Sequence, residues 1–145
     1  MIVIADSNIF FSALLTPKGV IAQILTSKSK IQFLVPDYLI EEIEEHLQRI
    51  ADYVNKSKTE IKQNLKQLMV KITIVPTEEI PMKYRQKAVE IVSDIDKDDA
   101  PFLALHFYKK HKIWTGDRTL IDGLTAKGYD IFVTTTQLQD KLYKR

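Results

Sequence analysis

The sequence predicts a three-layer α/β/α sandwich with a central, mostly parallel five-stranded sheet. Short apolar runs rich in Val and Ile alternate along the chain with longer segments in which apolar residues recur at helical spacing. This alternation is typical of parallel strands that are joined by helices. The chain has 145 residues and shows no internal repeat or low-complexity linker, so we expect a single domain over residues 1–145.

Five apolar runs are expected to form the strands of the sheet. Each run is too short for a helix, and most are bounded by residues that favour turns. Pro36 and Pro76 close the second and third runs, because proline lacks the backbone N–H that a central strand needs. The expected strands are residues 2–4, 31–35, 71–75, 112–115 and 129–133.

The segments between these runs carry apolar stripes at helical spacing. The clearest stripe is Leu39, Ile43, Leu47 and Ile50, which predicts one helix over residues 37–51. A Thr-rich segment at residues 134–136 is expected to cap the last helix. The other expected helices lie at residues 9–14, 20–25, 58–69 and 82–92, around Phe102–Phe107, and around Leu120–Leu124.

Composition excludes several classes of site. The chain contains no cysteine, which excludes disulfides, thiolate metal sites and cysteine nucleophiles. No apolar run approaches the roughly 20 residues of a membrane span, and no signal peptide is recognisable at the N-terminus. We therefore expect a cytoplasmic protein that does not contact a membrane. The net charge of +2 is compatible with nucleic acid binding but does not require it.

Acidic residues stand where the fold could bring them together. Asp6 ends the first strand and Asp117 follows the fourth, and parallel strands present these ends at the same edge of the sheet. Asp99 opens the helix between them in sequence and shares the inward face of that helix. A fourth carboxylate could come from the Glu-rich helix. There, both Glu42 and Glu44 flank the apolar stripe, and helical geometry alone does not separate them.

Carboxylates that share one site repel each other, and a divalent cation removes this conflict. Oxygen ligands favour Mg²⁺ or Mn²⁺ over zinc, and such a site suits phosphodiester hydrolysis. Taken singly, each acid has a simpler explanation. Asp6 and Asp99 could only cap helices, Asp117 could only belong to a turn, and the glutamates could form a solvated face.

The acidic turn at residues 94–99 contains four aspartates with different expected roles. Asp94 and Asp96 precede the helix and are expected to lie in solvent. Asp98 is expected to cap the helix. Only Asp99 is expected to face the site, near the positive end of the helix dipole.

Histidines and lysines give weaker signals. The three histidines have no ligand or triad spacing and are interpreted as packing or surface residues. Lysines and one arginine cluster at residues 56–71, 109–112 and 141–145. Each cluster has the simpler interpretation of a solvated face. If the chain binds RNA, we expect lysines from these clusters to line a groove beside the acids.

Four motifs in order resemble those of the PIN-domain nucleases, and the resemblance covers nearly the whole chain. They are residues 4–8 (IADSN), 36–43 (PDYLIEEI), 98–105 (DDAPFLAL) and 114–120 (WTGDRTL). The resemblance places the four acids of the family on Asp6, Glu42, Asp99 and Asp117. The sequence departs from the family pattern at Pro101 and at His106, where the family usually has a small residue.

The resemblance implies a metal-dependent endoribonuclease directed at single-stranded RNA, of the small VapC-like toxin type. Asp6, Glu42, Asp99 and Asp117 would hold one or two Mg²⁺ or Mn²⁺ ions. A water activated there would attack the phosphorus in line, leaving a 5′-phosphate and a 3′-hydroxyl. Asn8 and Thr115 would orient the carboxylates. The family also implies an antitoxin protein as a partner and a homodimer.

Two other functions remain open at this point. One is a PIN module that binds RNA or a partner protein but cuts weakly or not at all. The other is a receiver-like phosphoacceptor domain, which also gathers acids at strand ends. The second is disfavoured because Val75-Pro76 and Val133-Thr134 stand at the ends of the third and fifth strands, where a receiver needs its own functional residues.

Overall fold

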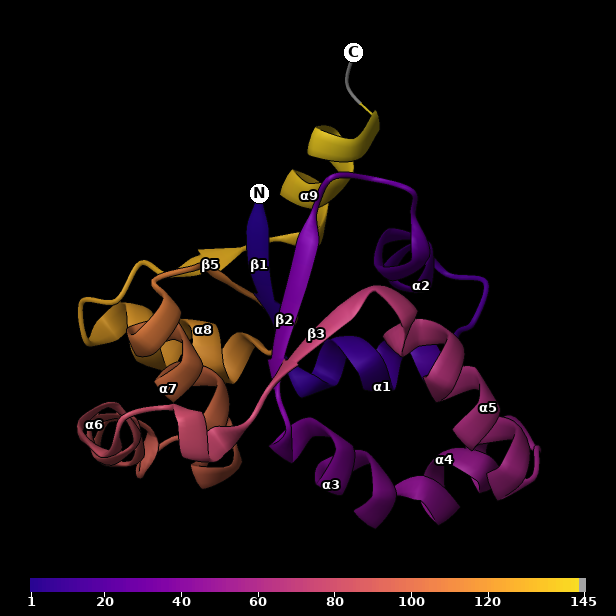
Figure 1. The fold of residues 1–145 in the computed structure, drawn as a ribbon, viewed down its shortest axis with the longest axis horizontal. Coiled ribbons are helices and arrows are strands. Elements are labelled where there is room, and N and C mark those ends of the chain that lie inside the picture. Colours follow the sequence, from indigo (N-terminus) through magenta and orange to yellow (C-terminus); the bar gives the residue numbers. More distant parts are fainter. Residues whose placement is uncertain (144–145) are drawn as a thin grey trace.

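One parallel sheet forms the centre of the molecule, and β1 is its middle strand. The computed structural model describes residues 1–143, in which five strands pair in the order β3-β2-β1-β4-β5. Figure 1 shows β3, β2 and β1 lying next to one another in this order. All four pairings are parallel, so the carboxyl ends of the strands share one edge. The strands are β1 (Ile2–Ala5), β2 (Gln32–Pro36), β3 (Ile72–Val75), β4 (Ile113–Trp114) and β5 (Phe132–Val133).

Helices fill the connections between the strands. The α-helices are α1 (Ser7–Leu15), α2 (Val20–Thr26), α3 (Tyr38–Glu45), α4 (Leu47–Val54), α5 (Lys58–Leu68), α6 (Met82–Val92), α7 (Ala100–Lys109), α8 (Arg118–Ala126) and α9 (Thr135–Tyr143). Short 3₁₀ turns are η1 (Met69–Lys71), η2 (Thr77–Glu79) and η3 (Lys97–Asp99). Within residues 1–143 no single helix is long and apolar enough to cross a membrane. One pair, α1 with α2, passes that test by length and composition together, but it is bent by 113°.

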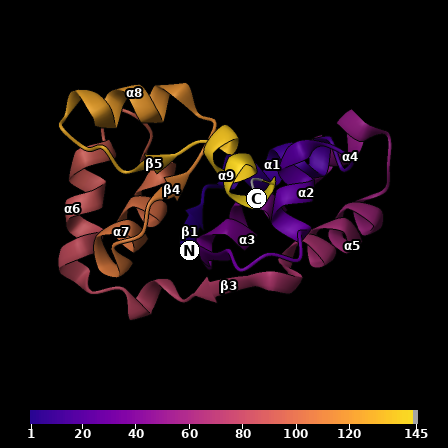
Figure 2. The same ribbon diagram turned by 90° about the horizontal axis from the view of Figure 1, so that it is seen from above.

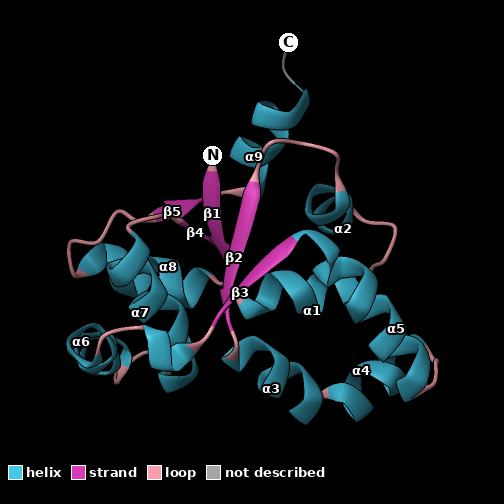
Figure 3. Ribbon diagram, in the orientation of Figure 1, coloured by secondary structure: helices cyan, strands magenta, loops and turns pink. Residues whose placement is uncertain are grey.

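The helices form two groups on either side of the strands (Figure 3). Helix α7 packs against β1, β2 and β4, and α6 lies along its outer side, as the view from above shows (Figure 2). Helix α1 contacts α2, α3, α4 and α5 in the second group. The central strand is the most deeply buried, with Val3, Ile4 and Ala5 fully inaccessible to solvent. The predicted three-layer sandwich is therefore confirmed, and its sheet is entirely parallel.

The expected helix over residues 37–51 is divided in two. Helix α3 ends at Glu45 and α4 begins at Leu47, with His46 between them at φ −105° and ψ 9°. The apolar stripe continues across this break, because Leu39, Ile43, Leu47 and Ile50 are all buried. The prediction of one continuous helix was wrong, since burial of the stripe tolerates a change of axis that periodicity alone does not reveal.

Candidate functional site

Asp6 lies at the carboxyl end of the central strand and is 1% exposed. One carboxylate oxygen caps α1 by accepting a hydrogen bond from the Ser7 backbone N–H at 2.8 Å. The other accepts a hydrogen bond from the Thr115 hydroxyl at 2.7 Å. Burial raises the pKa of Asp6 to about 6; these two hydrogen bonds lower it, and the nearby charges of Asp117 and Asp96 raise it further.

Thr115 joins the ends of β1 and β4. Its hydroxyl group lies 2.7 Å from Asp6 Oδ2 and 3.2 Å from Asn8 Oδ1, and its oxygen accepts the backbone N–H of Asp117 at 3.0 Å. Asn8 Oδ1 also accepts the backbone N–H of Gly116 at 3.3 Å. Asp117 caps α8 through the N–H of Leu120 at 3.2 Å. The structure thus brings four of the expected site residues together through one buried hydroxyl.

Glu42 is the glutamate of α3 that turns inward. It is 9% exposed, whereas Glu41, Glu44 and Glu45 are exposed, so burial separates Glu42 from Glu44. Burial raises the pKa of Glu42 to about 7; a hydrogen bond with the Ser7 side chain lowers it, and the charge of Asp6 raises it. Its Oε1 atom is buried without a hydrogen-bond partner.

Asp99 directly precedes α7 and is 7% exposed. Its side chain does not cap the helix, and its Oδ2 atom is buried without a partner. Burial raises the pKa of Asp99 to about 8, and the charges of Asp6, Asp96, Asp117 and Glu42 add to this rise. Pro101 is accommodated in the first turn of α7, where its missing N–H is not needed.

The other aspartates of the acidic turn differ from expectation. Asp98 does not cap α7, because it lies within η3 and its carboxylate accepts a hydrogen bond from the Tyr38 hydroxyl at 2.9 Å. Asp96 caps η3 through the Asp98 N–H at 3.0 Å. It is exposed, as expected, but its charge also raises the pKa values of Asp6, Glu42 and Asp99. Sequence reasoning missed this proximity, which follows from the fold of the turn.

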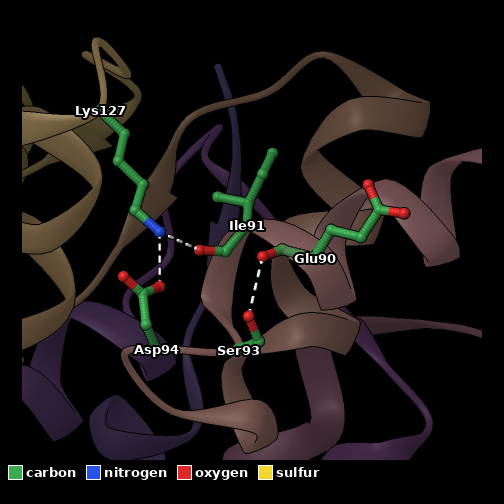
Figure 4. Close-up of polar contacts among 5 residues, drawn as sticks. All are labelled: Glu90, Ile91, Ser93, Asp94 and Lys127. Carbon is green, nitrogen blue, oxygen red and sulfur yellow. Dashed lines mark hydrogen bonds and ion pairs between the residues drawn. The ribbon is translucent and has the colours of Figure 1, made fainter.

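Asp94 is exposed and makes its ion pair with a lysine. As Figure 4 shows, its carboxylate pairs with the Lys127 ammonium group, which follows α8. The Nζ–Oδ1 distance is 2.5 Å, and the same ammonium group donates to the Ile91 carbonyl. The hydrogen bond from Lys127 lowers the pKa of Asp94. This contact ties the end of α6 to the end of α8.

The donor set is suited to a hard divalent cation. Asp6, Glu42, Asp99 and Asp117 offer only oxygen atoms, and two buried oxygens lack any partner. Carboxyl groups whose pKa values are raised by burial and by mutual repulsion would be stabilised as anions by a cation among them. In residues 1–143, however, no three His, Asp or Glu side chains already stand in an arrangement that could hold one ion. Binding would therefore have to draw the side chains together.

The histidines have structural contacts, as interpreted from the sequence. The ring of His46 meets Phe11 edge-on, with centroids 5.6 Å apart. His106 Nδ1 lies 2.7 Å from the His111 carbonyl oxygen, and burial lowers the pKa of His106. His106, where the sequence departs from the pattern of the PIN-domain nucleases that it resembles, is thus held by a hydrogen bond.

The expected lysine groove beside the acids is wrong for residues 109–112. Lys109 and Lys110 stand at the last turn and C-cap of α7, whereas Asp99 precedes its first turn. Lys112 precedes β4, whereas Thr115 follows it. Of the third cluster, Lys144 and Arg145 lie outside the described residues. Basic charge therefore gathers at the opposite end of α7 from the acids.

Comparisons with known proteins identify the family of this chain through a family model and its fold through a solved structure. The family model described as "PIN domain" matches residues 4–141. A search of the curated proteins found no match. Among solved structures, VapBC2 from Rickettsia felis, bound to a DNA fragment from its promoter, is similar with a TM-score of 0.65 and 11% sequence identity. The alignment covers 92% of this chain and 97% of that one. The length of the family match and the order of the elements lead to one conclusion: this chain belongs to the PIN-domain family.

Proposed function

We propose that the protein is a Mg²⁺- or Mn²⁺-dependent endoribonuclease that hydrolyses phosphodiester bonds in single-stranded RNA. PIN domains are generally nucleases, and they typically use divalent metal ions. The observation that carries the proposal is the pair of buried, unpartnered oxygens, Glu42 Oε1 and Asp99 Oδ2, beside the buried carboxylate of Asp6. Leaving such atoms unsatisfied costs free energy, which a bound cation would recover.

Asp6, Glu42, Asp99 and Asp117 would hold the ion. When bound, a divalent ion activates water and neutralises charge on the phosphoryl oxygens. Thr115 keeps the Asp6 carboxylate in one orientation by donating to Oδ2. Asn8 fixes the loop after β4 through the Gly116 N–H, which sets the position of Asp117. The N-terminus of α7 adds a positive dipole that favours the ionised form of Asp99.

We also propose that the chain acts as the toxin of a toxin–antitoxin pair, as a homodimer in the cytoplasm with residues 1–145 as one nuclease domain. The likeness to the VapBC2 structure supports an antitoxin protein as its partner. Co-expression with the product of a neighbouring gene, followed by co-purification, tests this part separately from the chemistry.

Cleavage of a labelled single-stranded RNA with EDTA, Mg²⁺ or Mn²⁺ tests the nuclease proposal. We expect cleavage with either ion, none with EDTA, and none with Asp99→Asn, which removes one ionised ligand. Asp94→Asn is the matched control and should be near neutral, because Asp94 is paired with Lys127 and is not among the charges that raise the pKa values of Asp6, Glu42 and Asp99. RNA binding without cleavage at any Mn²⁺ concentration would favour the alternative of a binding module.

A further inference from the structure

Aromatic rings and lysines gather on the paired helices α6 and α7, at the end remote from the acids. The rings of Tyr84 and Tyr108 lie 6.2 Å apart between centroids and are tilted by 39°. Both side chains are half-buried, and α6 packs along α7 (Figure 2). We name the surface made by Lys83, Tyr84, Lys87, Tyr108, Lys109 and Lys110 the α6–α7 patch.

Each lysine of the patch lies over a ring. The ammonium nitrogens of Lys83 and Lys110 lie 4.9 and 5.7 Å from the centre of the Tyr84 ring. That of Lys109 lies 4.7 Å from the centre of the Tyr108 ring. The ammonium nitrogen of Lys87 lies 4.4 Å from the centre of the buried Phe107 ring. Three positive charges are thus held over the tyrosine pair, and a fourth lies over the adjacent Phe107 ring.

None of these charges is neutralised by a carboxylate in the described part of the chain. The salt bridges found in residues 1–143 are Arg118–Asp122 and Lys127–Asp94, which leaves all four patch lysines without an acidic partner. The positive charges around the patch also affect His106. After burial, the charges of Lys110, His111 and Lys87 also lower the pKa of His106. Like charges that are gathered without a counter-charge favour an anionic ligand.

We propose that the α6–α7 patch binds single-stranded RNA, with phosphates at the lysines and a base stacked on the tyrosine pair. This inference rests on the proposed function, which makes RNA the substrate. Lysines bind phosphates electrostatically, and aromatic faces accept any base. An acidic protein would use the lysines but would have no need of the paired rings. The ten residues of α7 place the patch about 15 Å from Asp99 along the helix axis, at 1.5 Å per residue.

The test measures binding of a fluorescein-labelled 20-nucleotide oligouridylate to the full chain by fluorescence anisotropy, in EDTA. For Lys83→Gln combined with Lys110→Gln, we expect weaker binding and a salt dependence shallower by about 1.4 in slope, since each phosphate contact contributes about 0.7. For Tyr84→Leu, we expect affinity to fall by roughly 5- to 150-fold, the value of one stacked base. Thermal melts with and without Mn²⁺ check that each variant folds and keeps its carboxylate site.

The matched control is Lys28→Gln combined with Lys30→Gln, which removes the same charge from exposed positions in the turn between α2 and β2. It should leave RNA affinity close to that of the parent. An equal loss in the control would overturn the proposal, because net charge alone would then explain binding. Unchanged affinity in Tyr84→Leu would also overturn it, because the tyrosine pair would then take no part in binding RNA.

Failure of this inference is distinguishable from failure of the proposed function, because binding is measured without cleavage. A protein that cuts RNA while its patch variants bind like the parent refutes the patch alone. A protein that binds through the patch but never cuts refutes the nuclease and leaves the patch standing.

Discussion

Three buried acids of the site have raised pKa values. In the folded protein the pKa values of Asp6, Glu42 and Asp99 are about 6, 7 and 8, all above the usual range near 4. Between about pH 4 and pH 8, these three carboxyl groups therefore keep protons in the folded protein that they have already lost in the unfolded chain. Stability that depends on these protons is present at low pH and is lost as pH rises through the folded pKa values.

We therefore expect the free energy of unfolding of the metal-free protein to fall between pH 5 and pH 8. Each of the three acids contributes at most about 1.4 kcal/mol per pH unit while it stays protonated only in the folded state. Asp99→Asn removes one contribution, so its slope should be shallower than that of the parent. Urea unfolding in EDTA at pH 5, 6, 7 and 8 measures both slopes. A parent that is most stable at pH 8 would contradict the burial of these acids.

The sequence alone indicated three candidate site residues, Asp6, Asp99 and Asp117, because they stand at the ends of strands and at the start of a helix. Glu42 could not be separated from Glu44 by angle around the helix, since the two flank the apolar stripe equally. Burial of Glu42 and its hydrogen bond with Ser7 decide between them. The closeness of Asp96 to the site could not be foreseen either, because it depends on η3, a turn without periodicity.

At the scale of the elements, the ends of β1 and β4 are coupled through Thr115. Thr115→Val keeps the shape of the side chain but removes the donor to Asp6 Oδ2 and the acceptor of the Asp117 N–H. We expect the free energy of unfolding to fall by about 1 to 3 kcal/mol, the cost of leaving buried polar groups unsatisfied. Thr115→Ser, which keeps the hydroxyl, serves as the control. Equal stabilities of the two variants by urea unfolding would show that this hydroxyl contributes nothing.

The order of strands and helices was predictable because each element has its own hydrophobic period. The break at His46 was not, because Leu39, Ile43, Leu47 and Ile50 stay buried on both sides of it. Strand ends were also overestimated: β5 comprises only Phe132 and Val133, while the apolar run begins near Tyr129. Hydrophobicity indicates which residues are buried but not which of them pair in the sheet.

For the whole molecule, an ion that binds only the folded state adds to its stability by mass action. At a hundredfold excess of Mn²⁺ over the dissociation constant the gain is about 2.7 kcal/mol. In a chain of this size that gain corresponds to a rise in melting temperature of roughly 5 to 11 °C. Asp6→Asn should show a much smaller rise. Equal rises in the two proteins, measured by differential scanning calorimetry, would exclude a site that includes Asp6.

The distribution of charge over the molecule was the least predictable feature. Lysine clusters can be counted in sequence, but their position relative to the acids depends on the direction of α7 and β4. Helix α7 starts beside Asp99 and ends at Lys109. The same helix therefore has an acidic residue at one end and basic residues at the other, a separation that overall composition does not reveal.

The place of β1 in the middle of the sheet has a consequence during synthesis. The hydroxyl that orients Asp6 belongs to Thr115, which is made 109 residues later. At about 5 to 20 residues per second, a ribosome needs roughly 5 to 22 s to add them. During that interval a nascent chain can pair β1 with β2 and β2 with β3, but it cannot assemble the carboxylate cluster. The site is therefore completed only after β4 has emerged, later than the β1, β2 and β3 part of the sheet.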